Sequence, residues 1–137
     1  GRIKDLDLIS IFFKNEKIKN IKLPVSAPFH CELMSNATEV MKKEFEKINF
    51  KESKNILISN VTADKVSNPD DLKSLLINQI EKRVRWRESI INMIKYGVDH
   101  FIEIGPGKVL SGLVKRIDKN VKITSINNQS DVKSLKI

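Results

Sequence analysis

Residues 96–113 read Tyr-Gly-Val-Asp-His-Phe-Ile-Glu-Ile-Gly-Pro-Gly-Lys-Val-Leu-Ser-Gly-Leu, and this stretch decides the fold class. Three of the four residues in 101–104 are apolar, which predicts a short buried strand. The sequence Gly105-Pro106-Gly107 then predicts a tight turn. From Val109 to Ile117 the apolar residues return at intervals of three or four, which predicts a helix. A strand that turns directly into a helix is a unit from which α/β folds are built.

The rest of the chain continues this alternation of strands and helices. A strand is predicted over 121–126, and the apolar stretches 21–25 and 56–61 are predicted as two earlier strands. Four further helices are predicted over 5–14, 33–48, 72–80 and 86–94. We therefore expect an α/β fold with a parallel sheet, right-handed crossovers and flanking helices. Residues 127–137 are expected to form a polar tail.

The composition is that of a globular protein without a membrane-spanning helix. The chain has 137 residues, of which 40% are hydrophobic and 31% charged, so disorder is excluded as its main description. No apolar run approaches the roughly 20 residues that cross a bilayer, and no membrane partner is expected. The single cysteine, Cys31, excludes an internal disulfide and favours a reducing, cytoplasmic compartment. With two isolated histidines, it gives no metal-ligand spacing, so no metal is expected.

The net charge of the chain is +8, from 25 Lys and Arg against 17 Asp and Glu. This balance permits an acidic partner such as nucleic acid, a membrane surface or an acidic protein. The cations are spread along the whole chain instead of forming a block, so nucleic-acid binding is allowed but not indicated. A non-catalytic basic α/β module that binds nucleic acid or a partner protein is therefore the alternative function.

A histidine lies where a predicted strand and loop lead into a predicted helix. Residues 23–34 read Leu-Pro-Val-Ser-Ala-Pro-Phe-His-Cys-Glu-Leu-Met. A side chain at such a junction can face the crevice at the carboxyl end of a parallel sheet, where α/β proteins bind ligands. Because imidazole titrates near neutral pH, His30 can take a proton from a weak nucleophile and later return it. The alternative for His30 is a structural, hydrogen-bonded role.

The stretch around His30 resembles the histidine motif of the malonyl-CoA:acyl-carrier-protein transacylase family. Three further segments resemble motifs of that family in the same order: Ser59-Asn60-Val61, the stretch 79–90 with its Gln and Trp, and the Gly-Pro-Gly stretch 96–113. The resemblance runs from about residue 23 to residue 126. It implies the carboxyl-terminal part of an α/β-hydrolase-like acyltransferase domain over 24–126. Residues 1–23 would then be the end of a small ferredoxin-like subdomain.

The resemblance also implies an activity and the residues that carry it. The family moves a malonyl group from coenzyme A to acyl carrier protein in fatty-acid synthesis, through a serine ester. By position, His30 would be the general base, and the backbone carbonyl of Gln79 would orient its imidazole in place of a carboxylate. Malonyl-CoA would be the substrate and acyl carrier protein the partner, with no cofactor and no nucleic acid. The alternative for Gln79 is a solvent-facing helix residue.

The nucleophile of that family is missing from this sequence. In the family, the serine lies in a Gly-His-Ser-x-Gly elbow, and none of the five glycines here brackets a serine in a Gly-x-Ser-x-Gly pattern. Gly1 in place of an initiating Met fits a fragment, and the chain resembles somewhat under half of a family member. The chain would hold the base but not the nucleophile, so we expect it to be inactive by itself.

Two neighbours of His30 have competing interpretations. In related acyltransferases, Phe before the histidine accompanies malonyl selectivity and Ser accompanies branched substrates. The resemblance therefore implies that Phe29 excludes a methyl branch, whereas the alternative is ordinary core packing. Cys31 is expected to be a small buried filler and not a nucleophile, because successive side chains diverge at such a junction. We expect structural roles for His100 and for Gly105-Pro106-Gly107, which is too short for a Walker loop.

Overall fold

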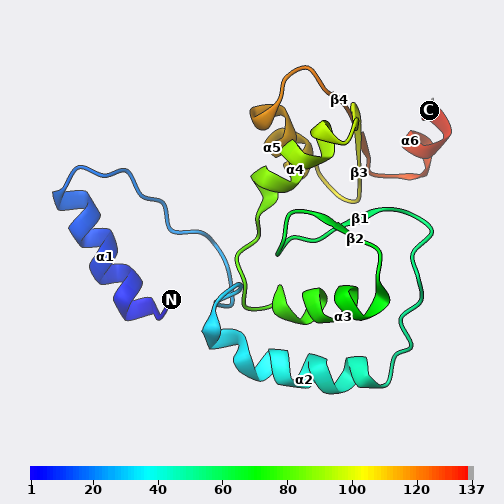
Figure 1. Cartoon of the computed structure of the whole chain (residues 1–137). Helices are drawn as coiled ribbons and strands as arrows, with labels where there is room; N and C mark the ends of the chain where they lie inside the picture. Colours follow the sequence, from blue (N-terminus) through cyan, green and yellow to red (C-terminus); the bar gives the residue numbers. More distant parts are fainter. Residues whose placement is uncertain (136–137) are drawn as a thin grey trace. The chain divides into compact units, whose positions relative to one another are not determined.

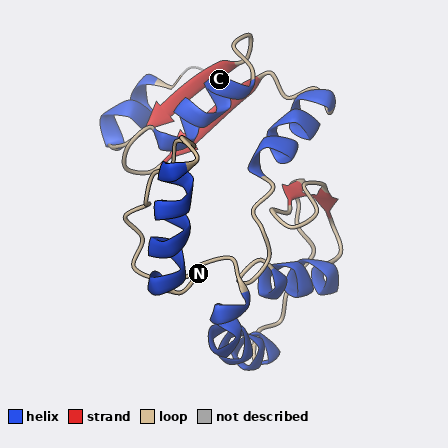
Figure 2. Cartoon of the chain, turned by 90° about the vertical axis from the view of Figure 1, so that its left-hand side faces the viewer, coloured by secondary structure: helices blue, strands red, loops and turns tan. Residues whose placement is uncertain are grey.

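The computed structural model describes residues 1–135, and the chain divides into two compact units. The first unit consists of Gly1–Val61 and Lys65–Val84, and the second consists of Thr62–Asp64 and the chain from Arg85 onward. Helices joined to short strands make up both units (Figure 1 and Figure 2). In the described residues, each strand pairs only with a strand of its own unit.

The helices of the first unit follow the predicted periodicity. They are α1 (Ile3–Asn15), the short 3-10 helix η1 (Glu32–Met34), α2 (Ser35–Glu46) and α3 (Pro69–Asn78). The start of α3 is stabilised by an N-cap residue and a proline. The side chain of Asn68 accepts hydrogen bonds from the backbone N–H groups of Asp70 and Asp71 at 2.8 and 3.2 Å, and Pro69 occupies the first turn, where no donor is needed. The helices α2 and α3 pack against each other.

The predicted buried strand over 56–61 is wrong in length, burial and pairing. The structure has β1 (Leu57–Ile58) paired antiparallel with β2 (Lys65–Val66), with Leu57 opposite Val66. Ile56 and Leu57 are exposed. The chain leaves the strand directly after Ile58, because the Ser59 hydroxyl oxygen accepts the Val61 N–H at 3.1 Å and closes a turn.

The predicted strand over 21–25 is also absent. The segment runs between α1 and η1 without regular secondary structure. Within residues 1–135, the main-chain N–H and C=O groups of Ile21 and Lys22 have no hydrogen-bond partner. Ile21, Leu23 and Val25 alternate with other residues, which is the pattern of a strand. In the described residues, however, no strand lies beside this segment to pair with it.

The second unit contains the predicted parallel sheet and its crossover helix. Its elements are α4 (Trp86–Lys95), β3 (His100–Ile104), α5 (Val109–Ile117), β4 (Lys122–Ile126) and α6 (Gln129–Ser134). The strands β3 and β4 are parallel, with His100 opposite Lys122 and Ile104 opposite Ile126. The predicted α/β class with a parallel sheet and flanking helices is confirmed, and the residues expected as a polar tail include α6.

The Gly-Pro-Gly turn between β3 and α5 requires its glycines. Gly105 has φ +144° and Gly107 has φ +94°, conformations that side chains with a Cβ atom rarely adopt. The Gly105 N–H donates to the carbonyl of Ile126 at 2.9 Å, and the Gly107 N–H donates to Oδ1 of Asn127 at 2.7 Å. Both N–H groups therefore have partners at or next to the end of β4. The turn thus has the structural role that the sequence predicts.

A carboxylate on β3 caps the start of α5. The two oxygens of Glu103 accept the backbone N–H groups of Leu110 at 3.0 Å and Ser111 at 2.8 Å. A negative charge at a helix N-terminus is also favoured by the helix dipole. Hydrogen bonds from the Ser111 hydroxyl and from the Ser111 and Leu110 amides hold the pKa of the Glu103 carboxyl below its ordinary value of 4.5. The charged carboxylate of Glu103 therefore links β3 to the start of α5.

Replacing Glu103 by glutamine should lower the melting temperature of the chain near neutral pH, because the amide keeps one acceptor oxygen and loses the charge. A lowered carboxyl pKa stabilises the folded state above pH 4.5, and this stabilisation disappears as the pH falls through the lowered value. The difference in melting temperature between wild type and Glu103→Gln should therefore close at acidic pH. Thermal unfolding followed by circular dichroism measures it, with Glu39→Gln on α2 as the control. A difference that does not change with pH would contradict the charged cap.

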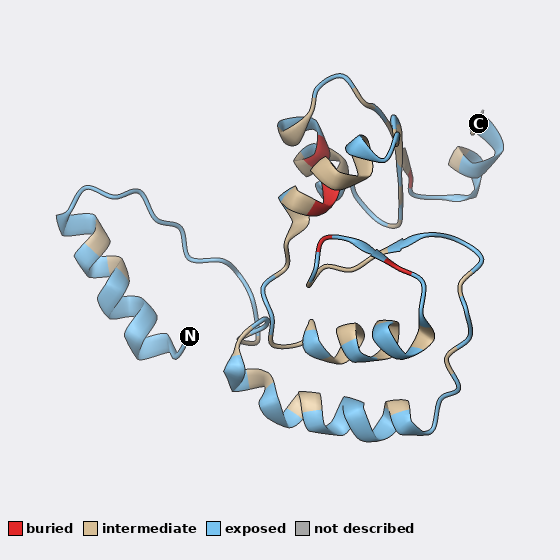
Figure 3. Cartoon of the chain, in the orientation of Figure 1, coloured by how far each residue is buried: buried red, intermediate tan, exposed pale blue. Residues whose placement is uncertain are grey.

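Burial is concentrated in the second unit (Figure 3). Its buried residues are Ala63, Ser89, Ile90, Val114 and Ile126, whereas the first unit buries only Val66 among the described residues. The helix α1 has no buried residue at all. Within residues 1–135, no helix is both long enough and apolar enough to cross a membrane.

Candidate active site

His30 lies in the loop before η1 and has a left-handed backbone conformation, with φ +62°. This conformation is uncommon for a residue with a side chain and costs free energy. A hydrogen bond from the His30 N–H to the carbonyl of Ile80, at 3.1 Å, holds it in place. The backbone of His30 is therefore anchored to the residues that follow α3.

The structure brings His30 and Gln79 together. Nδ1 of the His30 ring lies 2.9 Å from the backbone oxygen of Gln79. A carbonyl oxygen can only accept a hydrogen bond, so Nδ1 must carry the hydrogen. In the neutral ring, Nε2 is then the unprotonated nitrogen. The contact thus fixes the tautomer that a general base requires.

The position of Gln79 explains why its carbonyl is available. Gln79 is the C-cap residue of α3, and the last carbonyls of a helix have no partner within the helix. Ring Nδ1 of His30 uses the carbonyl of Gln79, and the main-chain N–H of His30 uses the next carbonyl, that of Ile80. Two consecutive peptide groups at the end of α3 therefore hold both the ring and the backbone of His30.

The side chain of Gln79 is half-buried and has a contact of its own. Its Oε1 accepts a long hydrogen bond of 3.5 Å from Nδ2 of Asn60. Sequence reasoning misses this role of Asn60 and the role of the Ile80 carbonyl. The Ser59-Asn60-Val61 motif is the one signal in the sequence that draws attention to Asn60.

The remaining candidate residues are placed as follows. Phe29 is 55% exposed, so core packing within the described chain does not account for it. Cys31 is half-buried, and its thiol donates to the carbonyl of Pro28 at 3.1 Å. Nε2 of His100 lies 2.8 Å from Oγ1 of Thr124, on the neighbouring strand, so His100 has a partner in the sheet.

The His30 site holds a positioned imidazole ring, and its Nε2 is open. In residues 1–135, no hydroxyl group is hydrogen-bonded to His30, and the residue is exposed. The same residues contain no group of three or more His, Cys, Asp or Glu side chains that could hold a metal ion. The arrangement can accept a proton at Nε2, but the group that gives up the proton has to come from elsewhere.

Comparisons with known proteins point to one family, although no family model matches the chain. The malonyl CoA-acyl carrier protein transacylase of Bacillus subtilis (strain 168) is 41% identical over 133 residues, which cover 96% of this chain and 42% of that protein. The crystal structure of the malonyl CoA-acyl carrier protein transacylase from Clostridium perfringens matches with a TM-score of 0.85 and 40% identity, over 94% of this chain and 41% of that one.

A second similar structure is a complex. It holds a type II PKS acyl-carrier protein with its malonyl-transacylase, and it matches at a TM-score of 0.89 and 28% identity, over 98% of this chain and 44% of that one. The chain thus spans less than half the length of the curated relatives that it matches. The matched part is a carboxyl-terminal portion.

Proposed function

Because this chain corresponds in sequence and in fold to a carboxyl-terminal portion of the malonyl-CoA:acyl-carrier-protein transacylase family, we propose that it supplies the general base for malonyl transfer from coenzyme A to acyl carrier protein. His30 is the base, and the backbone carbonyl of Gln79 orients it. The nucleophilic serine belongs to the portion of a transacylase that this chain does not contain. The chain by itself is inactive.

One observation carries this proposal: Nδ1 of His30 lies 2.9 Å from the backbone oxygen of Gln79. Serine-dependent acyl transfer needs an imidazole whose far nitrogen is unprotonated and held in one direction. Such enzymes commonly use a carboxylate to orient the ring, whereas here a peptide carbonyl at the end of α3 takes that position. The residues at this contact are the two that the resemblance assigns to base and orienter.

The first half of the reaction forms the serine ester. The serine hydroxyl gives its proton to Nε2 of His30 while its oxygen attacks the thioester carbonyl of malonyl-CoA. The carbon–sulfur bond then breaks, and the imidazolium returns the proton to the sulfur of coenzyme A. The partial negative charge at the C-terminus of α3, where Gln79 lies, favours the imidazolium that exists between these two proton transfers.

The second half transfers the malonyl group to acyl carrier protein. The thiol of the carrier gives its proton to Nε2 of His30, and its sulfur attacks the ester carbonyl. The carbon–oxygen bond breaks, and the same proton returns to the serine oxygen. The chain's residues therefore move one proton in each direction, and Gln79 keeps the ring in place through both steps.

Acyl carrier protein is the proposed partner, and its acidic character suits the net charge of +8. A transacylase with a similar structure is known in complex with a type II PKS acyl-carrier protein. Neither the fold nor the comparisons favour the alternative of a nucleic-acid-binding module.

The function can be tested in a chimera that joins the part of the Bacillus subtilis transacylase preceding its matched region to this chain. Malonyl transfer to carrier protein by this chimera is the assay.

Phe29 is proposed to set the selectivity for an unbranched malonyl group. It precedes His30 directly and is 55% exposed, so its ring is available to a substrate. In the chimera, Phe29→Ser should raise the ratio of kcat/KM for methylmalonyl-CoA to that for malonyl-CoA by about tenfold or more, the discrimination expected of one methyl group. Val40→Ser, a similar loss of an exposed apolar side chain on α2, is the control. An unchanged ratio in a folded Phe29→Ser variant would contradict the role.

A further inference from the structure

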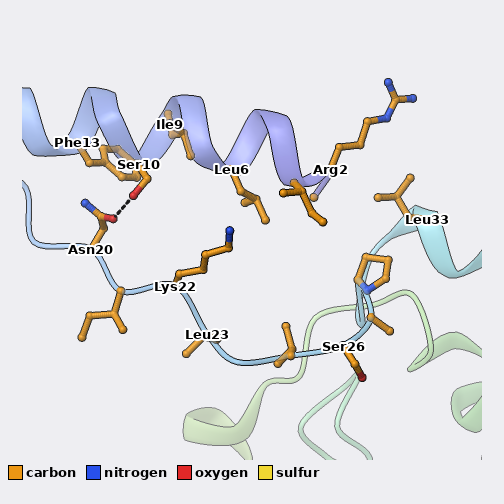
Figure 4. A pocket seen from close by; sticks show the side chains of 16 residues that line it. Arg2, Leu6, Ile9, Ser10, Phe13, Asn20, Lys22, Leu23, Ser26 and Leu33 are labelled. Atoms are coloured by element: carbon orange, nitrogen blue, oxygen red, sulfur yellow. Dashed lines mark hydrogen bonds between the residues drawn. The ribbon is translucent and has the colours of Figure 1, made fainter.

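The loop that carries His30 is hydrogen-bonded to the rest of the first unit at one place. In the described part of the chain, the bonds from His30 to the carbonyls of Gln79 and Ile80 are the only ones that join residues 24–31 to a distant segment. The preceding part of the loop supplies no further bond, because residues 26–28 line an apolar groove beside α1 (Figure 4). The position of the His30 ring therefore depends on the end of α3.

The end of a helix is its least stable part, because its last carbonyl groups lack partners within the helix. Gln79 is the C-cap residue of α3. After it, the N–H groups of Ile80 and Glu81 donate to carbonyls three residues earlier, each at 3.2 Å. Hydrogen bonds of this 3-10 type have poorer geometry than those of an α-helix. Fraying here would withdraw both carbonyls that hold His30, so an anchor outside the helix would stabilise the site.

Asn60 provides such an anchor. Its Nδ2 donates to Oε1 of Gln79 at 3.5 Å, and this is the only side-chain hydrogen bond of residues 76–82 in the described chain. Both side chains are half-buried, which reduces competition from water. Asn60 is itself held in place, because it follows the paired strand β1 and lies in the turn that the Ser59 hydroxyl closes with the Val61 N–H. The side chain of Gln79 is thus attached to a turn that is stabilised independently of α3.

We propose that Asn60 is a positioning residue of the His30 site. Through the side chain of Gln79, it holds the end of α3 in the conformation that presents the Gln79 carbonyl to Nδ1 of His30. The hydrogen then stays on Nδ1, and Nε2 stays open. The hydrogen bond of Asn60 is long, so its effect is modest. The proposal rests on the proposed function for the use of the open Nε2, but the position of the ring does not require turnover.

The test follows the tautomer of His30 by ¹⁵N NMR of the chain labelled in histidine, at a pH at which the ring is neutral. The chain has only two histidines, and His100, which is bonded to Thr124 in the second unit, is the internal reference. Asn60→Ala should lower the ratio of the Nδ1–H to the Nε2–H tautomer of His30 by about threefold or more, because the acceptor at Nδ1 is less firmly held. Magic-angle spinning allows the measurement on self-associated protein.

A double-mutant cycle shows whether Asn60 acts through Gln79. Gln79→Ala removes the same hydrogen bond from the other side, so it should lower the ratio as much as Asn60→Ala, and the double variant should lower it no further. Asn78→Ala is the matched control and should leave the ratio unchanged. Asn78 ends the same helix, is exposed, and has no side-chain hydrogen bond within residues 1–135.

The chimera gives a kinetic counterpart to this measurement. There, Asn60→Ala should lower kcat for malonyl transfer by about threefold or more and leave KM for malonyl-CoA unchanged, because the ring is positioned less well while the substrate contacts remain. Asn78→Ala should leave both constants unchanged.

The outcomes separate the role of Asn60 from the proposed function. An unchanged tautomer ratio in Asn60→Ala, additive effects of Asn60→Ala and Gln79→Ala, or an equal loss in Asn78→Ala would each overturn the proposal. If Asn60→Ala does not fold, Gln79→Ala decides by the same ratio, since it breaks the same bond. A lowered ratio with a chimera that transfers no malonyl group would support the positioning role and contradict the proposed function. An active chimera in which Asn60→Ala changes neither the ratio nor kcat would support the function and overturn the role of Asn60.

Discussion

Replacing His30 by alanine in the chimera should lower kcat for malonyl transfer by about 10³-fold or more, because the serine would lose its base. His30 is the residue whose ring is held by the Gln79 carbonyl with Nε2 left open. The measurement is the steady-state rate of malonyl transfer to acyl carrier protein, with circular dichroism to show that the variant is folded. A folded His30→Ala variant that retained most of its kcat would contradict the assignment of the base.

The second histidine of the chain provides the matched control. The ring of His100 is bonded to Thr124, so His100→Gln should leave kcat within a few-fold of the wild-type value. Gln79→Ala should also cost far less than His30→Ala, because the orienting oxygen belongs to the backbone. Loss of activity as large in His100→Gln as in His30→Ala would show that the effect is one of stability and not of catalysis.

The chain of residues 1–137 by itself should show no measurable malonyl transfer and should self-associate. Its inactivity follows from the absent serine elbow, since His30 can accept a proton but nothing in the sequence is arranged as Gly-x-Ser-x-Gly to attack the thioester. Its association follows from the open sheet: in residues 1–135, β3 and β4 each pair on one side only. Exposed apolar residues such as Ile104 and Val109 add to this tendency.

Transfer assays on the purified chain, together with sedimentation velocity, test both parts. A chain that sediments as a monomer would contradict the expected association. Turnover in a monomer fraction would overturn the serine-ester mechanism, because the chain would then carry a complete active site.

The second unit could be predicted well from the sequence because its strands find their partners within it. The apolar runs over 101–104 and 121–126 pair with each other as β3 and β4, and the Gly-Pro-Gly turn lies where the pattern places it. The predictions failed where strand formation depends on a neighbour. Residues 21–25 have the pattern of a strand but no pairing strand in the described chain, and residues 56–61 turn away after Ile58.

The candidate site was predicted only in part. The resemblance names His30 and Gln79, and the structure brings these two residues together. The left-handed backbone of His30 and its bond to the Ile80 carbonyl could not be predicted, because they depend on how the end of α3 meets a loop 49 residues away in sequence. The contact of Asn60 with Gln79 likewise joins residues that no local pattern connects.

Malonyl transfer by the chimera tests the central claim most directly. The chimera joins the part of the Bacillus subtilis transacylase that precedes its matched region to the His30 site of this chain. If this chain supplies the general base, the folded chimera will move malonyl groups from coenzyme A to acyl carrier protein, and its His30→Ala variant will not. A folded chimera without transfer, or with transfer that survives His30→Ala, would contradict the account.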